Sequence, residues 1–137
     1  MRTFTKLKNK FIEKFEQIFK YGLVGIINTL ITWLLLSILM NVFGVSYTTS
    51  NAVGYVAGFF NSFIMNKLWT FKANQVSTIR QFVKFTAVFA ICYFIQLGLV
   101  ILMVEKLSLG KNISQLIGMV IYTIIGFLLN KLFTFKE

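Results

Sequence analysis

No charged side chain occurs between Tyr21 and Asn66, where the sequence reads YGLVGIINTLITWLLLSILMNVFGVSYTTSNAVGYVAGFFNSFIMN. A helix needs about 20 apolar residues to cross about 30 Å of hydrocarbon, so this stretch is long enough for two such helices. Asn, Gly, Ser and Tyr side chains gather at residues 41–47, which predicts a turn there. We therefore expect transmembrane helices at about residues 21–40 and 48–65.

A second pair of apolar stretches follows. Residues 85–104 and 112–130 carry no charge, and residues 105–111 form a short charged turn between them. Strands of a membrane β-barrel would alternate apolar and polar side chains, whereas these runs are continuously apolar. The sequence therefore predicts an all-α integral membrane protein with four transmembrane helices in two hairpins.

The composition agrees with membrane insertion and limits the chemistry. Of the 137 residues, 57% are hydrophobic and 13% are charged, which is more apolar surface than a soluble domain of this size can bury. The chain has one Cys and no His, so we expect no disulfide framework, Cys/His metal site or nucleophile pair. No acidic residue falls inside a predicted span, which argues against a proton-coupled exporter and a metal-dependent glycosyltransferase. We predict a single membrane domain over residues 1–137 that is not an enzyme and uses no metal or cofactor.

The basic residues predict the orientation in the cell membrane. Of the fourteen Lys and Arg residues, only Lys106 and Lys111 fall on one side of the predicted membrane, and the rest fall on the other. Basic residues favour the cytoplasmic side. Both termini and the linker at residues 67–84 are therefore expected in the cytoplasm.

The segment before the first span has the pattern of an amphipathic helix. Lysines cover much of its surface, and its apolar residues recur at spacings of three and four: Phe4, Leu7, Phe11, Phe15 and Ile18. This pattern predicts an interfacial helix over residues 1–19 that lies on membrane lipids. Docking to a partner enzyme is the alternative. Nucleic-acid binding is not expected, because no recognition module is present.

An internal repeat relates the two hairpins. Residues 17–72 align without a gap on residues 81–136 after a shift of 64 positions. The heptad NKLWTFK at residues 66–72 becomes NKLFTFK at residues 130–136, with six of seven positions identical. Because each repeat holds two helices, both copies insert in the same orientation, related by an axis along the membrane normal. We expect the two heptads to meet at the cytoplasmic face.

The heptads carry polar groups that are unusual beside hydrocarbon. Asn66 and Asn130 are costly there unless they are paired, so each is expected to cap a helix end, contact the other repeat or bind a ligand. The sequence leaves a structural cap and a ligand contact equally open. The same heptads add a hydroxyl and an aromatic ring in each copy: Thr70, Phe71, Thr134 and Phe135.

Nearby basic side chains suggest an anionic ligand. Four lysines flank the hairpin helices at this end: Lys20, Lys67, Lys84 and Lys131. If each hairpin closes here, their ammonium groups ring one surface and attract a phosphate or diphosphate. Arg80 would add a bidentate contact, and Lys111 would receive the phosphate on the outer side. For any one of these lysines alone, topology marking is the favoured explanation.

The predicted spans also contain polar side chains. Asn28 lies in the first span and Asn61 in the second, where Gly54 and Gly58 form a small-xxx-small step. Close helix packing with interhelical hydrogen bonds is the usual role of such residues. A hydrophilic groove for a sugar head group is the alternative.

The run FKYGLVGIINT at residues 19–29, followed by NKLWTF at residues 66–71, resembles the GtrA-like family over about residues 17–136. The resemblance implies a flippase. It would move a monosaccharide linked to a polyprenyl phosphate, such as undecaprenyl phosphate, to the outer leaflet for glycosylation of teichoic acid, O-antigen or a similar cell-wall or surface polysaccharide. Phe89 stands where the first repeat has Gly25, so the two halves cannot pack identically.

We therefore predict a lipid-phosphate and sugar site with these residues: Lys20, Asn28, Asn61, Asn66, Lys67, Thr70, Phe71, Arg80, Lys84, Lys111, Asn130, Lys131, Thr134 and Phe135. Four helices are few to enclose a sugar path, so a homodimer is a further expectation. The alternative function is a non-transporting membrane anchor or regulatory subunit of a polyprenyl-phosphate glycosyltransferase.

Overall fold

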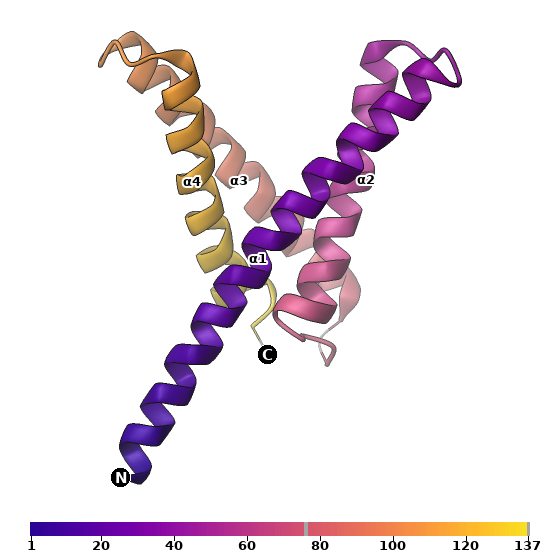
Figure 1. The fold of residues 1–137 in the computed structure, drawn as a ribbon. Coiled ribbons are helices and arrows are strands. Elements are labelled where there is room, and N and C mark those ends of the chain that lie inside the picture. The colour runs from indigo at the N-terminus through magenta and orange to yellow at the C-terminus, as the bar shows by residue number, and fades with distance from the viewer. Residues whose placement is uncertain (76, 137) are drawn as a thin grey trace. The chain divides into compact units, whose positions relative to one another are not determined.

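The computed structural model describes residues 1–75 and 77–136, and their backbone is largely helical (Figure 1). The elements in chain order are α1 (Arg2–Asn41), α2 (Tyr47–Met65), the π-helical turn η1 (Asn66–Thr70), α3 (Thr78–Glu105), α4 (Lys111–Leu129) and the π-helical turn η2 (Asn130–Thr134). No strand occurs in this part of the chain, so the all-α prediction is confirmed.

The chain divides into two compact units, Met1–Lys72 and Ala73–Glu137. The first contains the hairpin of α1 and α2 with η1, and the second contains the hairpin of α3 and α4 with η2. Each unit holds one of the two sequence repeats. The prediction of a single domain over residues 1–137 stays a prediction.

Small residues allow close contact between the helices of the first hairpin. A Cβ atom at Gly54 would lie 3.0 Å from the carbonyl oxygen of Thr32, and one at Gly58 would lie 2.9 Å from the Thr32 hydroxyl oxygen. The Thr32 hydroxyl donates a hydrogen bond to the Gly54 carbonyl at 3.1 Å. The predicted small-xxx-small step is therefore a site of direct backbone approach.

The turn between α1 and α2 has the residues that such a turn requires. Gly44 has a φ of +64°, a conformation that residues with a Cβ rarely adopt. Ser46 then caps α2, because its hydroxyl oxygen accepts a hydrogen bond from the Thr49 backbone N–H at 3.4 Å.

The helices of the second hairpin also come close together at the position equivalent to Gly54. A Cβ atom at Gly118, the counterpart of Gly54, would lie 2.8 Å from Val100 Cγ2 and 3.2 Å from Gln96 Cγ. Gln96 is the counterpart of Thr32, so a longer side chain here fills the space beside the glycine. The α3–α4 contact therefore rests on side chains, whereas the α1–α2 contact involves the backbone.

Both second helices end in a π-helical turn at the heptad. The Phe71 backbone N–H donates to the Asn66 carbonyl at 2.9 Å, and the Phe135 N–H donates to the Asn130 carbonyl at 2.8 Å. Each bond spans five residues, one more than in an α-helix. Single π-turns of this kind are frequent at functional sites. The two heptads therefore share an uncommon backbone conformation as well as a sequence.

Within residues 1–75 and 77–136, three helices are long and apolar enough to cross a membrane: Thr3–Asn41, Thr78–Glu105 and Lys111–Thr134. α2 occupies the residues predicted for another span, but Thr, Ser, Asn and Gly residues interrupt its apolar sequence. The fourth crossing stays a prediction for this reason.

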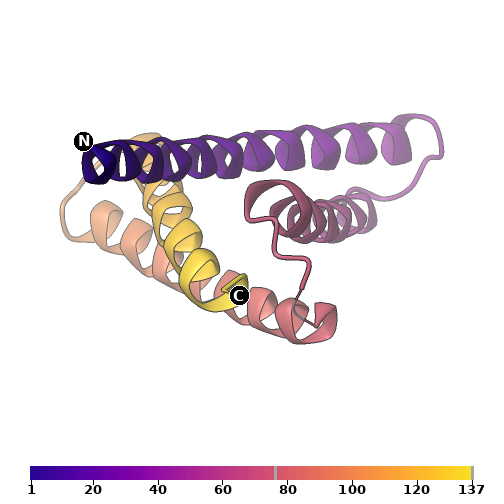
Figure 2. The ribbon, with the colours of Figure 1, turned by 90° about the horizontal axis from the view of Figure 1, so that it is seen from below.

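The segment at residues 1–19 is not a separate helix. Figure 2 shows α1 as one unbroken helix from the N-terminus to the turn before α2. The chain has no proline, and no other break in hydrogen bonding separates the basic segment from the apolar one. The predicted interfacial helix is therefore not confirmed as an element of its own.

Candidate functional site

Each hairpin is closed at one end by a lysine that lies over an aromatic ring of its heptad. We call this the heptad end. In the first hairpin the Lys20 ammonium lies 5.5 Å from the centre of the Trp69 ring. In the second, the Lys84 ammonium lies 4.8 Å from the Phe133 ring and donates a hydrogen bond to the Phe133 carbonyl at 3.2 Å. The two pairs occupy the same positions of the repeat. A cation over a ring is stabilised by the ring's negative face.

A second ring contact is also repeated. Tyr21 and Phe71 have ring centres 6.2 Å apart, and their counterparts Phe85 and Phe135 have ring centres 6.0 Å apart. These contacts tie the first helix of each hairpin to the residue that follows the π-turn. The condition that each hairpin closes at this end is thus met within each unit.

The polar residues of the π-turns are buried. Asn66 is 1% exposed, and its Nδ2 group donates to the Ser62 hydroxyl at 3.3 Å. In the described part of the chain, Asn66 Oδ1 and the Thr70 hydroxyl have no hydrogen-bond partner. Asn130 and Thr134 are equally buried, and the Thr134 hydroxyl likewise has no partner among the described residues. Buried polar atoms of this kind are rare and call for a water, a ligand or a neighbouring group.

The other two predicted lysines belong to the π-turns. Lys67 is largely buried, at 8% exposure. Lys131 is half-buried, and its ammonium lies 5.5 Å from the ring of Phe127 one turn earlier in the helix. Lys20 and Lys67 therefore belong to the heptad end of the first hairpin, and Lys84 and Lys131 to that of the second. A single ring that joins all four lysines stays a prediction.

Two predicted cations lie away from the π-turns. Arg80 is exposed in the first turn of α3. Lys111 is exposed at the first residue of α4, at the end of that helix opposite to η2. Their predicted roles as additional phosphate contacts stay predictions.

Lys20 also has an acidic partner. Its ammonium forms an ion pair with Glu16, one turn earlier on α1. A hydrogen bond from Lys20 and its positive charge lower the pKa of the Glu16 carboxyl, which precedes the predicted span. The pair partly neutralises the first heptad end, whereas no ion pair to Lys84 occurs among the described residues.

The two predicted intramembrane asparagines contact each other. Asn61 Nδ2 donates to Asn28 Oδ1 at 2.7 Å across the α1–α2 interface and also approaches Met65 Sδ at 3.4 Å. Both asparagines are half-buried. Interhelical packing with a hydrogen bond, the simpler of the two predictions, is therefore present.

The two repeats carry different residues around the positions of these asparagines. Asn28 and Asn61 correspond to Cys92 and Ile125 in the second hairpin. Gly25 and Gly58 correspond to Phe89 and Tyr122, whose rings meet edge to face with centres 6.4 Å apart. The expectation that the halves cannot pack identically is confirmed. At these positions the first hairpin has polar and small residues, whereas the second has largely apolar and aromatic ones.

Some buried polar residues were not assigned a role from the sequence. Gln81 is fully buried and donates from Nε2 to the Ala73 carbonyl at 3.0 Å, which joins α3 to the segment before it. Ser50 and Ser114 are fully buried counterparts at the helix contacts. The signal was available, because all three coincide with an identical residue after the 64-residue shift.

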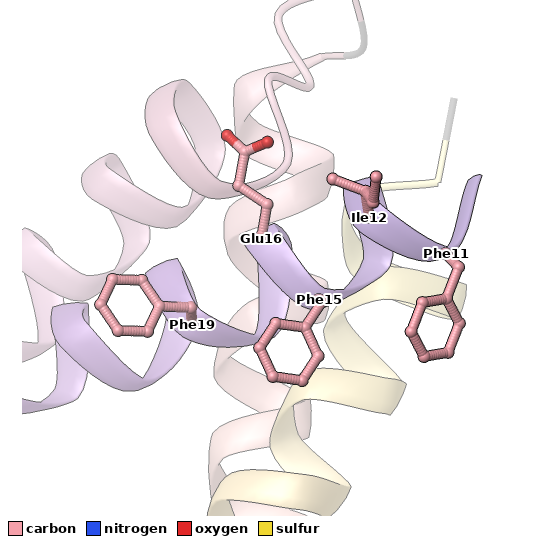
Figure 3. A pocket seen from close by; sticks show the side chains of 5 residues that line it. All are labelled: Phe11, Ile12, Phe15, Glu16 and Phe19. Carbon is pink, nitrogen blue, oxygen red and sulfur yellow. The ribbon is translucent and has the colours of Figure 1, made fainter. Parts of the chain in front are cut away.

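The N-terminal part of α1 presents an open apolar surface. Figure 3 shows Phe11, Phe15 and Phe19 on the same side of the helix, whereas Glu16 points away from them. Phe11 and Phe15 are 71% and 67% exposed. Aromatic surface of this kind marks a membrane or protein contact.

Each heptad end brings together groups that can bind an anion. Each heptad end combines ammonium groups, which bind phosphate as movable point charges, with buried amide and hydroxyl groups. No group of three or more His, Cys, Asp or Glu side chains that could hold a metal occurs among the described residues.

Comparison with known proteins agrees with this structure. A family model described as the GtrA/DPMS transmembrane domain matches residues 20–135, from Lys20 to Phe135, whose ring contacts Phe85 in the second hairpin. A search of curated proteins found no match. Because the family match covers most of the chain and both hairpins, this protein belongs to the GtrA/DPMS transmembrane-domain family and is a multi-pass membrane protein.

Proposed function

We propose that this protein carries a monosaccharide linked to a polyprenyl phosphate from the cytoplasmic to the outer leaflet of the cell membrane. The sugar would then be added to a surface polysaccharide such as teichoic acid or O-antigen. Membership of the GtrA family supports this role. The observation that carries it is the heptad end, where a lysine over an aromatic ring lies beside buried Asn and Thr residues in both hairpins.

The orientation follows from the charge distribution. Because twelve of the fourteen basic residues lie on one side of the predicted spans, we place both termini and both heptad ends at the cytoplasmic face. Lipid-linked sugars made in the cytoplasmic leaflet would then meet the heptad ends first. Lys106 and Lys111 would lie at the outer face, and the phosphate would leave near Lys111.

The proposed transport step requires no covalent chemistry. The phosphate docks at a heptad end, on Lys20 and Lys67 in the first hairpin or on Lys84 and Lys131 in the second, and the polyprenyl tail stays in the lipid. The head group then moves along polar side chains between helices. Since no acidic residue lies within a predicted span to couple protons, transport runs down the gradient set by synthesis inside and consumption outside. The protein is accordingly proposed to be a carrier and not an enzyme, and a homodimer would enlarge the polar path.

Reconstitution tests this proposal. The purified protein is placed in liposomes with a labelled undecaprenyl phosphate sugar, and a membrane-impermeant reagent measures how much of the lipid reaches the outer leaflet. We expect rapid exchange with the wild-type protein and at least about tenfold slower exchange with Lys84→Ala or Asn66→Ala, since each removes a charged or buried polar contact. Lys10→Ala, an exposed lysine on α1, is the matched control. Wild-type exchange rates in both site variants would refute the proposal.

The second candidate is a non-transporting anchor or regulator of a polyprenyl-phosphate glycosyltransferase. The exposed aromatic side chains on the N-terminal part of α1 favour it, because they offer a surface to a partner enzyme. The same liposomes distinguish the two functions. No exchange by the protein alone, together with altered activity of an added glycosyltransferase, would support the second function over the first.

A further inference from the structure

The hydrogen-bonded asparagines of the first hairpin retain unused hydrogen-bonding capacity. An asparagine side chain offers two N–H donors and an oxygen with two lone pairs. The bond from Asn61 Nδ2 to Asn28 Oδ1 uses one donor and one lone pair. In the part of the chain that the structure describes, Asn28 Nδ2 donates to no protein group and Asn61 Oδ1 accepts from none.

These groups lie where an unused donor or acceptor is unfavourable. Both asparagines are half-buried, so neither residue is fully enclosed by the α1–α2 hairpin. Both also lie within predicted membrane spans, where hydrocarbon cannot form hydrogen bonds. An outside partner with hydroxyl groups would satisfy both the donor and the acceptor.

The fold does not require this polar pair. The second hairpin also packs its two helices together, with Cys92 and Ile125 at the equivalent positions. It also carries the rings of Phe89 and Tyr122 where the first hairpin has Gly25 and Gly58. The two hairpins therefore differ in the side chains that they carry at these positions, although both fold as helical hairpins.

The pair lies a short distance from the heptad end of its own hairpin. At a rise of about 1.5 Å per residue, Asn61 lies about 8 Å before Asn66 along the helix, and Asn28 lies about 12 Å after Lys20. A sugar attached directly to a phosphate that is held beside Asn66 would extend toward the pair.

We infer that the Asn28–Asn61 pair binds the hydroxyl groups of the sugar while the phosphate is held at the heptad end, and that only the first hairpin has this contact. The inference rests on the proposed function and assigns different roles to the two hairpins. The first hairpin recognises phosphate and sugar, whereas the second recognises phosphate alone. The ligand class is a single polyhydroxylated ring on a lipid phosphate.

The test exchanges the pair for the residues that the second hairpin already uses, as Asn28→Cys with Asn61→Ile. Binding is measured in nanodiscs with undecaprenyl phosphate and with the same lipid bearing one glucose, galactose or N-acetylglucosamine. The matched control, Cys92→Ala with Ile125→Leu, alters the equivalent positions of the second hairpin. Binding of bare undecaprenyl phosphate reports whether each variant retains its heptad end.

We expect the wild-type protein and the control to bind at least one sugar-bearing lipid about tenfold more tightly than the bare lipid, which corresponds to about 1.4 kcal/mol. The double variant should bind all four lipids alike, with its affinity for the bare lipid unchanged. A sugar preference retained by the variant, or absent from the wild-type protein, overturns the inference while the proposed carrier function stands. If the double variant no longer binds the bare lipid, the test is repeated with the single Asn61→Ile variant. Loss of bare-lipid binding by that variant also overturns the inference. Failure of the wild-type protein to bind any of the lipids overturns the proposed function as well.

Discussion

Replacement of Gly54 by alanine tests the close contact of α1 and α2 most directly. The new Cβ atom would lie 3.0 Å from the Thr32 carbonyl oxygen and 3.1 Å from Thr32 Cγ2, whereas ordinary contacts begin near 3.4 Å. The hairpin must therefore open by about 0.4 Å here, because a backbone oxygen cannot rotate away. The hydrogen bond from the Thr32 hydroxyl to the Gly54 carbonyl would lengthen with it.

Two contributions lower the stability of this variant, and one raises it. Overpacking of a close contact destabilises by about 1–3 kcal/mol. Weakening an interhelical hydrogen bond in a membrane adds about 0.6 kcal/mol. Alanine is favoured over glycine in a helix by about 1 kcal/mol, which acts in the other direction. We expect Gly54→Ala to lower the free energy of unfolding by about 0.6–2.6 kcal/mol.

Gly25→Ala is the matched control in the same hairpin. A Cβ atom there meets nothing within 4 Å, so the helix preference acts alone and the variant should gain up to about 1 kcal/mol. Trp33 and Trp69 both lie in the first unit, so tryptophan fluorescence during detergent-induced unfolding reports on this hairpin. A Gly54→Ala variant as stable as the wild type, or a Gly25→Ala variant destabilised to the same extent, would refute the reasoning.

Three further outcomes are expected. Lys84→Met should weaken binding of undecaprenyl phosphate in nanodiscs about tenfold, since it removes a charged donor, whereas Lys106→Met at the opposite end of α3 should not. Phe43→Cys, in the exposed turn after α1, should react with an impermeant thiol reagent in intact cells; protection would contradict the cytoplasmic termini. Because Lys20 lowers the pKa of Glu16 below its usual 4.5, their pair should persist at pH 4.5 and be lost only as the pH falls through the lowered pKa. Carbon NMR of the labelled Glu16 carboxyl follows this titration, and a midpoint at or above 4.5 would contradict the pair.

The sequence predicted the second helix of each hairpin to within a residue or two at both ends. The expected spans 48–65 and 112–130 correspond to α2 at Tyr47–Met65 and α4 at Lys111–Leu129. The first helices, α1 and α3, begin well before their apolar stretches. Hydrophobicity marks where a helix enters the membrane, whereas its start depends on backbone hydrogen bonds, which basic and polar residues also support.

The repeat identified the heptads, but not their conformation. A π-turn depends on the packing of the whole helix end, so the letters NKLWTFK do not specify it. The lysine–ring contacts join residues 49 positions apart, from Lys20 to Trp69 and from Lys84 to Phe133. The equal spacing of the lysine and the aromatic residue in both repeats was the available signal. Whether two residues so far apart in sequence touch depends on how the two helices of the hairpin pack.

The uninterrupted length of α1 has a mechanical consequence. Its 40 residues extend about 60 Å, twice the thickness of the hydrocarbon layer. The first five or so turns and the apolar turns after them therefore form a single rod with Lys20 near its middle. A tilt imposed on the protruding half, by lipids or by another protein, is transmitted along the rod and moves the Lys20 ammonium relative to the first heptad.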